Sequence, residues 1–247
     1  MSENVPQPQL NLEDVRQFYN LLPRIYEPAD LWHNATKNWI RRFILDHRQR
    51  ISLEANYRVL NAGSGGEDCG FPSEFVYHLD IAERRIAHLK RAFTGDLHAP
   101  PFADGFFDIS VCVGSVLNYC DAATAIGALG RVTRGKGHLF LEFETSWSLE
   151  LCFAHGFMQP AAVVTTFYDT RKVRLWAYLE EYIRSILRAN NFEVLAQSRA
   201  HIASPLVYQL TKDTNRSAWF SRLDPLLRRI PLLRRFCSNV IFFCRKT

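Results

Sequence analysis

No hydrophobic run in this sequence approaches the roughly 20 residues that a membrane-spanning helix requires. The first nine residues are polar and lack the apolar core of a signal peptide. The six cysteines are scattered, with no Cys-x-x-Cys pair and no His/Cys cluster at metal-ligand spacing. These absences argue against a membrane-spanning, secreted or zinc-binding protein, and we expect a cytoplasmic chain with no bound metal.

The sequence also lacks a strong overall charge. Its formal net charge is +5 over 247 residues, and the basic excess is concentrated late, where five arginines fall between positions 222 and 235. Basic residues are not interleaved with aromatic residues as in a nucleic-acid-binding surface, so we expect no nucleic-acid partner. A hydrophobic fraction of 47% and a charged fraction of 22% are ordinary for one large α/β domain.

Strand-like and helical patterns alternate through the middle of the chain. Such alternation is typical of a parallel sheet with helices on both faces. Later segments predict a hairpin, one more helix and two more strands, with a long connection between those strands. The predicted strands are 57–62, 75–80, 107–113, 137–143, 163–167, 173–177, 192–197 and 239–244, and the predicted helices are 82–90, 122–132 and 178–189.

Two helices are expected ahead of the first strand. After a flexible leader of ten residues, Asn11 can cap a helix, and a second helix is expected from about Asp30 to Ile51. We therefore divide the chain into an N-terminal helical cover, 1–56, and a ligand-binding domain, 57–247. Two segments are additions to the alternating core of that domain, a hairpin or lid insertion at 150–177 and a helical connection at 200–238.

The most informative stretch is 58–66, where a short apolar run ends in a glycine turn. Gly63 and Gly65 permit a sharp turn after a strand and a close approach of the backbone to a ligand. Asp80 ends the next apolar run, in a position to accept hydrogen bonds from the two hydroxyls of a ribose. Asp96 follows 16 residues later and suits the exocyclic amine of adenine. Each motif alone is also compatible with a turn that binds nothing, but together they form a nucleoside-binding layout.

The same turn argues against a dinucleotide. The NAD fingerprint has a third glycine three residues after the second, and Asp68 stands at that position. We expect a helix to begin near Glu67 and Asp68, and acids at the start of a helix repel a diphosphate. S-adenosylmethionine has a positive sulfonium and a positive amino group, and it tolerates these acids.

The order of the motifs resembles the class I S-adenosylmethionine-dependent methyltransferases, and within them the small-molecule type 11 group. The resemblance is close over 57–144 and looser over 175–199 and 239–246. It implies a Rossmann-like, doubly wound α/β fold with a mostly parallel seven-stranded sheet whose last strand is inserted antiparallel. The motifs that carry it are Val59 to Gly66, Asp80-Ile81, Gly95-Asp96 with 101–104, and Phe107-Asp108-Ile109.

The resemblance also implies a set of contacts for the cofactor, S-adenosyl-L-methionine. The glycine turn would approach the methionine part, Asp80 would hold the ribose, Asp96 and Leu97 would contact adenine, and 113–115 would line the floor beneath the sulfonium. The predicted contacts are Asn61, Gly63, Ser64, Gly65, Asp80, Ile81, Asp96, Leu97, Val113 and Ser115. The chain departs from the family at Asn61, where an acid is commoner, and at Ser64 and Glu67.

No motif identifies a catalytic residue. Asn118 and Tyr119 follow the fourth strand, where such enzymes usually face the acceptor, but they can equally be a capping and a packing residue. Tyr26 lies in the N-terminal cover, where a tyrosine can approach the sulfonium or pack in the core. His98 is a candidate base, although a structural role explains a loop histidine beside the adenine site better.

The expected reaction is methyl transfer to a small-molecule or lipid-linked acceptor by in-line (SN2) displacement, which needs a base only when the acceptor must lose a proton. Two alternatives stay open: a non-catalytic protein of the same fold that binds a partner chain, and an NAD(P)-dependent oxidoreductase.

The arginine-rich stretch 222–236 has two interpretations. It can make peripheral contact with a membrane, or it can be a helix whose leucines dock on the sheet while its arginines are solvated. Pro225 and Pro231 interrupt a long interfacial helix and favour the second interpretation.

Overall fold

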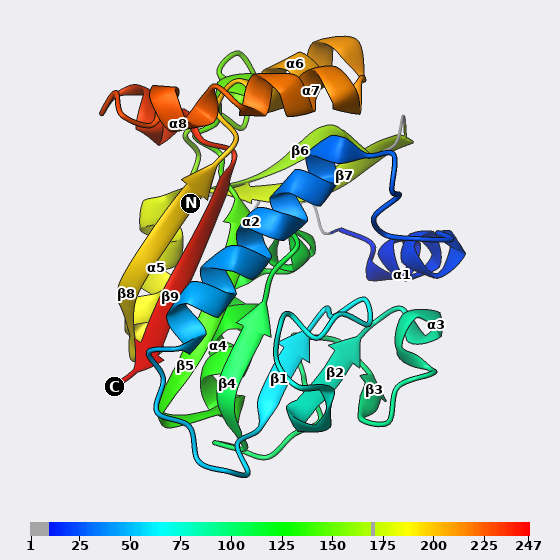
Figure 1. Cartoon of the computed structure of the whole chain (residues 1–247), viewed down its shortest axis with the longest axis vertical. Helices are drawn as coiled ribbons and strands as arrows, with labels where there is room; N and C mark the ends of the chain where they lie inside the picture. The colour runs from blue at the N-terminus through cyan, green and yellow to red at the C-terminus, as the bar shows by residue number, and fades with distance from the viewer. Residues whose placement is uncertain (1–9, 169–170) are drawn as a thin grey trace, which may run out of the picture.

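The computed structural model describes residues 10–168 and 171–247. Seven strands form one sheet in the order β3-β2-β1-β4-β5-β9-β8, and β6 and β7 form a separate hairpin (Figure 1). Strands β1 to β5 are parallel, and β9 is antiparallel to both β5 and β8. The predicted fold, a doubly wound sheet with its last strand inserted antiparallel, is confirmed.

The strands are β1 Val59–Ala62, β2 Val76–Asp80, β3 Ala92–Thr94, β4 Phe107–Cys112, β5 Thr133–Glu144, β6 Ala161–Tyr168, β7 Arg171–Tyr178, β8 Phe192–Ala200 and β9 Asn239–Lys246. The helices are α1 Leu12–Leu21, α2 Leu31–Arg48, α3 Glu83–Ile86, α4 Ala122–Val132, α5 Glu180–Ala189, α6 Ser204–Thr211, α7 Thr214–Ser221 and α8 Asp224–Leu227. Short 3-10 turns are η1 Ser73–Phe75, η2 Val116–Tyr119, η3 Leu149–Leu151 and η4 Leu233–Phe236. Most of the expected leader and the tip of the hairpin lie outside the described residues.

Two apolar cores lie on opposite faces of the sheet. Successive side chains of a strand point to opposite faces, so Leu139 and Leu141 of β5 join the core beneath α4 and α5, while Phe140 joins the other. On that second face α2 lies diagonally across the sheet (Figure 1) and buries Ile40, Phe43 and Ile44. Helix α1 buries no residue. Across the described residues, no helix is long and apolar enough to cross a membrane.

Three local expectations were wrong. The segment 82–90 contains a helix of only four residues, α3, and the strand β3 follows it, too short for a period-two pattern to reveal. No helix begins after the glycine turn, because residues 63–72 form turns that end in η1. The turn expected at 135–137 lies inside β5, where the pairing with β4 shifts register.

Candidate active site

A cavity of about 870 Å³ opens along the carboxyl ends of β1 to β5. Ligand pockets of doubly wound sheets lie at this edge and commonly measure about 300–1,000 Å³. One end, the sheet end, is lined by the loops after β1 to β4. The other, the hairpin end, is lined by residues of β5, η3, the β6–β7 hairpin and α6. All ten predicted cofactor contacts line this cavity: Asn61, Gly63, Ser64, Gly65, Asp80, Ile81, Asp96, Leu97, Val113 and Ser115.

The glycine turn has no room for side chains. Gly63 and Gly65 have φ values of +66° and +54°, and a Cβ atom would lie 2.4 Å from Val116 and 2.5 Å from Ile25, respectively. The backbone N–H of Gly65 donates to Asp80 Oδ2 (2.7 Å), and that of Ala82 donates to Asp80 Oδ1 (2.8 Å). Burial raises the pKa of Asp80, and these two amides act against the shift. They fix the carboxylate at the carboxyl end of β2.

Asn61, the main departure from the family, holds the turn by donating hydrogen bonds. Its Nδ2 donates to the carbonyl of Glu67 and to Cys69 Sγ. A carboxylate cannot donate, so the family's commoner acid would be unsuitable beside this carbonyl. The asparagine is therefore matched to this particular turn.

The two acids of the turn have partners elsewhere in the fold. Glu67 pairs with Lys37 of α2 (2.5 Å), and Asp68 pairs with His78 (3.3 Å). The expectation that these two acids begin a helix was wrong. The absence of a helix is a stronger argument against a bound diphosphate than repulsion by the acids. Without a helix here, the turn lacks the helix N-terminal amides that bind a pyrophosphate in dinucleotide-binding folds. This geometry argues against NAD(P).

His98 joins the loop after β3 to the start of α4. Its backbone N–H and Nδ1 both contact Asp96 Oδ1 (2.9 and 2.7 Å), and its Nε2 accepts from the backbone N–H of Asp121 (2.9 Å). The Asp121 bond requires an unprotonated Nε2, so the proton lies on Nδ1. These contacts agree with the structural role of His98, and both of the contacts to Asp96 use Oδ1.

The N-terminal segment lies over the sheet end of the cavity, and hydrogen bonds and an ion pair attach it to α3. Arg85 donates through Nε to the carbonyl of Tyr19 (2.8 Å) and through Nη2 to that of Leu22. Glu83 accepts from Arg16 (2.9 Å) and Asn20 (3.0 Å). The connection from α1 to α2 thereby reaches the glycine turn.

The three predicted catalytic candidates have different surroundings. Tyr26 lines the cavity, with its hydroxyl 3.5 Å from the place a Cβ on Gly114 would take. Tyr119 also lines it and bonds to the hydroxyl of Tyr19 (3.2 Å), but burial raises its pKa to about 12. Asn118 is fully buried and is not among the lining residues. Its amide donates to the carbonyls of Trp176 (2.6 Å) and Glu144 (3.1 Å), which favours the structural role.

Three glutamates that the sequence reasoning missed also line the cavity: Glu142, Glu144 and Glu150. Glu142 accepts from the backbone N–H groups of Gly114 and Ser115 (2.9 and 2.7 Å), and Glu144 accepts from Ser115 Oγ (2.8 Å). Burial raises the pKa of all three, to about 7 for Glu142 and about 8 for Glu150. The sequence signal was present: two acids two residues apart near the end of a buried strand point to the same side.

His33 lines the cavity from the first turn of α2. Its Nδ1 contacts Asp30 Oδ2 (2.5 Å), and its backbone N–H donates to Asp30 Oδ1 (3.0 Å) as an N-cap bond. Burial would raise the pKa of Asp30, but the bonds and charge of His33 outweigh it and lower the pKa. In the described part of the chain, no group of three or more His, Cys, Asp or Glu residues is arranged to hold a metal ion.

Solved structures of the same fold share little sequence with this chain. Geranyl diphosphate C-methyltransferase from Streptomyces coelicolor A3(2) has a TM-score of 0.61 and 11% identity, covering 98% of this chain and 100% of that one. An S-adenosylmethionine-dependent methyltransferase from Mesorhizobium loti has a TM-score of 0.52 and 14% identity, covering 87% and 100%. The [4+2]-cyclase SpnF has a TM-score of 0.52 and 18% identity, covering 83% and 80%. These likenesses establish the fold, which also serves a cyclase.

The sequence comparison assigns the domain type. No curated protein matches the chain significantly. Residues 60–141, from β1 into β5, match the family model of a methyltransferase domain. Residues 60–141 thus form a methyltransferase domain, and the matched family model and the fold agree with the resemblance to the class I S-adenosylmethionine-dependent methyltransferases of the type 11 group.

Proposed function

We propose that the chain transfers a methyl group to a small-molecule or lipid-linked acceptor by in-line displacement, with Glu144 accepting the acceptor's proton. The observation that carries this proposal is the position of Glu144. Its carboxylate accepts a hydrogen bond from Ser115 (2.8 Å), on the floor where the sulfonium is expected, and it lines the cavity. The geranyl diphosphate enzyme of the same fold supports a small acceptor.

The chain's own residues position the reactants. Bound S-adenosylmethionine supplies a methyl group already activated on sulfur, so the protein must orient the acceptor and exclude water. In this proposal the segment 1–56 covers the cofactor, and the hairpin with α6 covers the acceptor. Gln209 of α6 donates to Thr166 of the hairpin (2.9 Å), and Lys212 lies over the Phe167 ring (3.3 Å), so these two walls are joined.

In this proposal Glu144 and Glu150 have different roles: Glu144 accepts a proton, and Glu150 donates a hydrogen bond. The acceptor's lone pair forms the new bond to carbon as the carbon–sulfur bond breaks, and the acceptor's proton passes to Glu144. Burial raises the pKa of Glu144 and makes its carboxylate a stronger base. Burial raises the pKa of Glu150 to about 8, so at pH 7 its protonated form predominates and can donate a hydrogen bond.

A pair of isosteric variants tests this division. Glu144→Gln keeps the shape but removes the base, so we expect unchanged cofactor binding and methyl transfer lower by about 100-fold or more. Glu150→Gln is the matched control, because glutamine resembles a protonated glutamate, and its activity at pH 7 should stay near that of the wild type. The measurement is transfer of a labelled methyl group to a panel of phenols, amines, carboxylic acids and isoprenoid lipids.

Calorimetry with S-adenosylmethionine, S-adenosylhomocysteine and NADPH accompanies the assay. Binding of the first two alone, with transfer abolished in Glu144→Gln only, supports the proposal. Equal loss of transfer in both variants contradicts the role of Glu144. If the wild-type chain transfers no methyl group to any member of the panel but forms a stable complex with another protein, the non-catalytic alternative replaces the proposal.

A further inference from the structure

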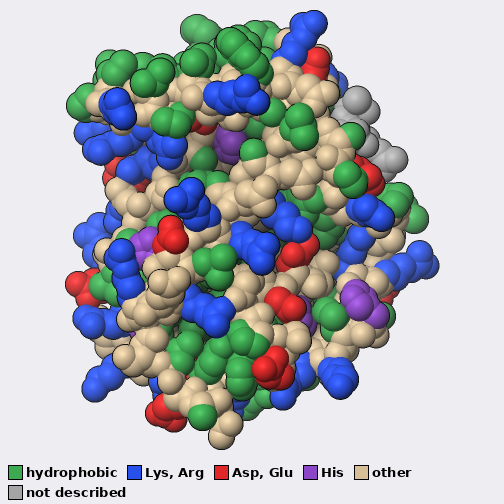
Figure 2. Space-filling model, in the orientation of Figure 1, with side chains coloured by type: hydrophobic (Ala, Val, Ile, Leu, Met, Phe, Trp, Pro, Cys, Tyr) green, Lys and Arg blue, Asp and Glu red, His purple; other side chains and the backbone are tan. Residues whose placement is uncertain are grey.

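The outer side of α6 to α8 and of the turn that follows α8 exposes large hydrophobic side chains. Figure 2 shows hydrophobic groups gathered over these elements at the top of the molecule. Their exposed fractions range from 37% for Leu223 to 77% for Leu210. We call this surface the apolar cap, and its residues are Leu210, Trp219, Leu223, Leu226, Ile230 and Leu232. The interpretation in which the leucines of 222–236 dock on the sheet is therefore wrong for most of them, and only Leu227 and Phe236 pack against the core.

A second segment adds to the same surface. The loop after η3 is held beside η4 by stacking of Phe157 on Phe236, with 6.2 Å between ring centroids. In this loop Phe153 is fully exposed. Large hydrophobic side chains exposed together on one side of a molecule usually mark an interaction site.

The charge around the apolar cap is positive. The stretch 214–236 contains six arginines and one aspartate, a net charge of +5, which equals the formal net charge of the whole chain. Arg222, Arg229, Arg234 and Arg235 are exposed. No ion pair formed within residues 10–168 and 171–247 involves these four side chains. Hydrophobic residues interspersed with arginines match an anionic lipid surface.

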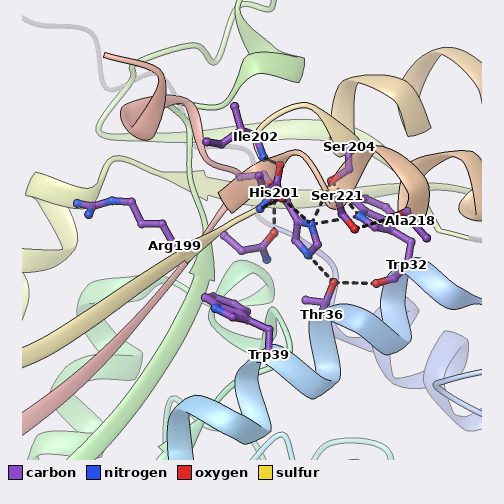
Figure 3. Close-up of polar contacts among 12 residues, drawn as sticks. Trp32, Thr36, Trp39, Arg199, His201, Ile202, Ser204, Ala218 and Ser221 are labelled. Atoms are coloured by element: carbon purple, nitrogen blue, oxygen red, sulfur yellow. Dashed lines mark hydrogen bonds and ion pairs between the residues drawn. The ribbon is translucent and has the colours of Figure 1, made fainter. Parts of the chain in front are cut away.

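A polar cluster around the buried His201 fixes the cap in this orientation (Figure 3). Trp32 of α2 donates to His201 Nδ1 and Ser204 Oγ (both 3.2 Å), and Thr36 Oγ1 contacts His201 Nε2 (2.7 Å). Asp224 of α8 accepts from the backbone N–H of His201 (2.9 Å). We call this cluster the His201 clasp. It attaches the inner side of α6 and α8 to α2 and leaves the leucines pointing outward.

The apolar cap is one helix away from the cavity. Pro205, Tyr208 and Gln209 of α6 line the hairpin end, while Leu210 of the same helix is exposed. A molecule leaving a bilayer beneath the cap would therefore meet the hairpin end of the cavity after crossing the thickness of one helix.

We propose that the apolar cap docks on the surface of an anionic lipid bilayer and that the acceptor is a lipophilic molecule drawn from that bilayer. The leucines and Trp219 enter the interfacial region, and the arginines contact lipid phosphates. The proposed docking is inferred from the exposed side chains of the apolar cap alone. Only the identity of the acceptor rests on the proposed function.

Vesicle flotation of the full chain tests the docking. We expect binding to vesicles of equal parts phosphatidylcholine and phosphatidylglycerol, weakened by high salt, and little binding to phosphatidylcholine alone. Arg222→Gln and Arg229→Gln should each lower the partition coefficient about fivefold, since one arginine near an anionic surface contributes about 1 kcal/mol. Leu226→Ser with Leu232→Ser should lower it about tenfold or more.

Matched controls use exposed residues outside the cap. Leu195→Ser on β8 and Arg42→Gln on α2 should bind vesicles like the wild type. All variants should keep their affinity for S-adenosylmethionine, which reports on the proposed function separately. The inference is overturned if the wild type does not float with anionic vesicles, or if cap and control variants float equally. It is also overturned if Leu226→Ser with Leu232→Ser converts a dimer to a monomer without changing flotation, because the cap would then join two copies of the chain.

Discussion

At the scale of single residues, Asn61 shows how one side chain is fitted to a turn. Asn61→Asp would remove two donated hydrogen bonds and place a buried carboxylate against the Glu67 carbonyl. Leaving these groups unsatisfied should lower the free energy of unfolding by about 2 kcal/mol and weaken cofactor binding. Urea denaturation and calorimetry measure the two effects. Asn215→Asp, at an exposed position, is the control and should change neither; a fully stable Asn61→Asp protein would contradict the account.

That the predicted cofactor contacts line one cavity was predictable at this scale, because they lie at the carboxyl ends of strands or in the short segments after them. Short loops at the ends of parallel strands meet at one edge, so local sequence is enough to bring Gly63, Asp80 and Asp96 together. The spacing of Glu142 and Glu144 indicates that they face one side, but it does not reveal their partners, which are distant in sequence. Glu142 accepts from Asn239, 97 residues away, and no spacing rule connects the two. That Ser115 binds Glu144 likewise depends on the pairing of β4 with β5.

At the scale of elements, the His201 clasp makes stability depend on pH. Burial, with the nearby charges of His33 and Arg228, lowers the pKa of His201 to about 3. The unfolded histidine titrates near 6.5, so between these values only the unfolded state binds the proton. The contribution of His201 to the free energy of unfolding is complete above pH 6.5. It decreases as the pH falls, and about 2 kcal/mol of it is lost at pH 5.

His201→Gln tests this contribution. Its free energy of unfolding is lower at pH 7, but its decrease between pH 7 and pH 5 should be about 2 kcal/mol smaller than that of the wild type. Urea denaturation at the two pH values gives both quantities. His155→Gln, at an exposed position, should keep the wild-type decrease, and parallel behaviour of His201→Gln and the wild type would refute the assignment.

Element boundaries were predictable where the apolar pattern was long. Helix α4 begins and ends at the predicted residues. In contrast, α3 and β3 are too short for a helical or a strand period to appear in the pattern of apolar residues. The missing helix between β1 and β2 could not be foreseen from the turn itself. On this face of the sheet, Ile40, Phe43 and Ile44 of α2 belong to the same core as residues of β1, β2 and β4, a long-range arrangement that the turn sequence does not encode.

At the scale of the whole molecule, the N-terminal segment contributes to the core through α2 and lines the cavity through both α1 and α2. Two truncated chains separate these contributions. A chain of residues 57–247 would expose the sheet face beneath Ile40, Phe43 and Ile44. Burial of three such side chains contributes about 6 kcal/mol, similar to the whole stability of many domains, about 5–15 kcal/mol. We expect this chain to be unfolded by circular dichroism.

A chain of residues 25–247 should behave differently. It lacks α1, which buries no residue, so its circular dichroism and melting temperature should stay close to those of the full chain. It also lacks Leu12, Val15 and Tyr19, which line the cavity, and we expect its affinity for S-adenosylmethionine to fall about tenfold, equivalent to 1.4 kcal/mol. If 57–247 folds and binds the cofactor as tightly as the full chain, the N-terminal segment is neither core nor cover. If 25–247 binds with full affinity, only α2 and the connection before it contribute to the cover.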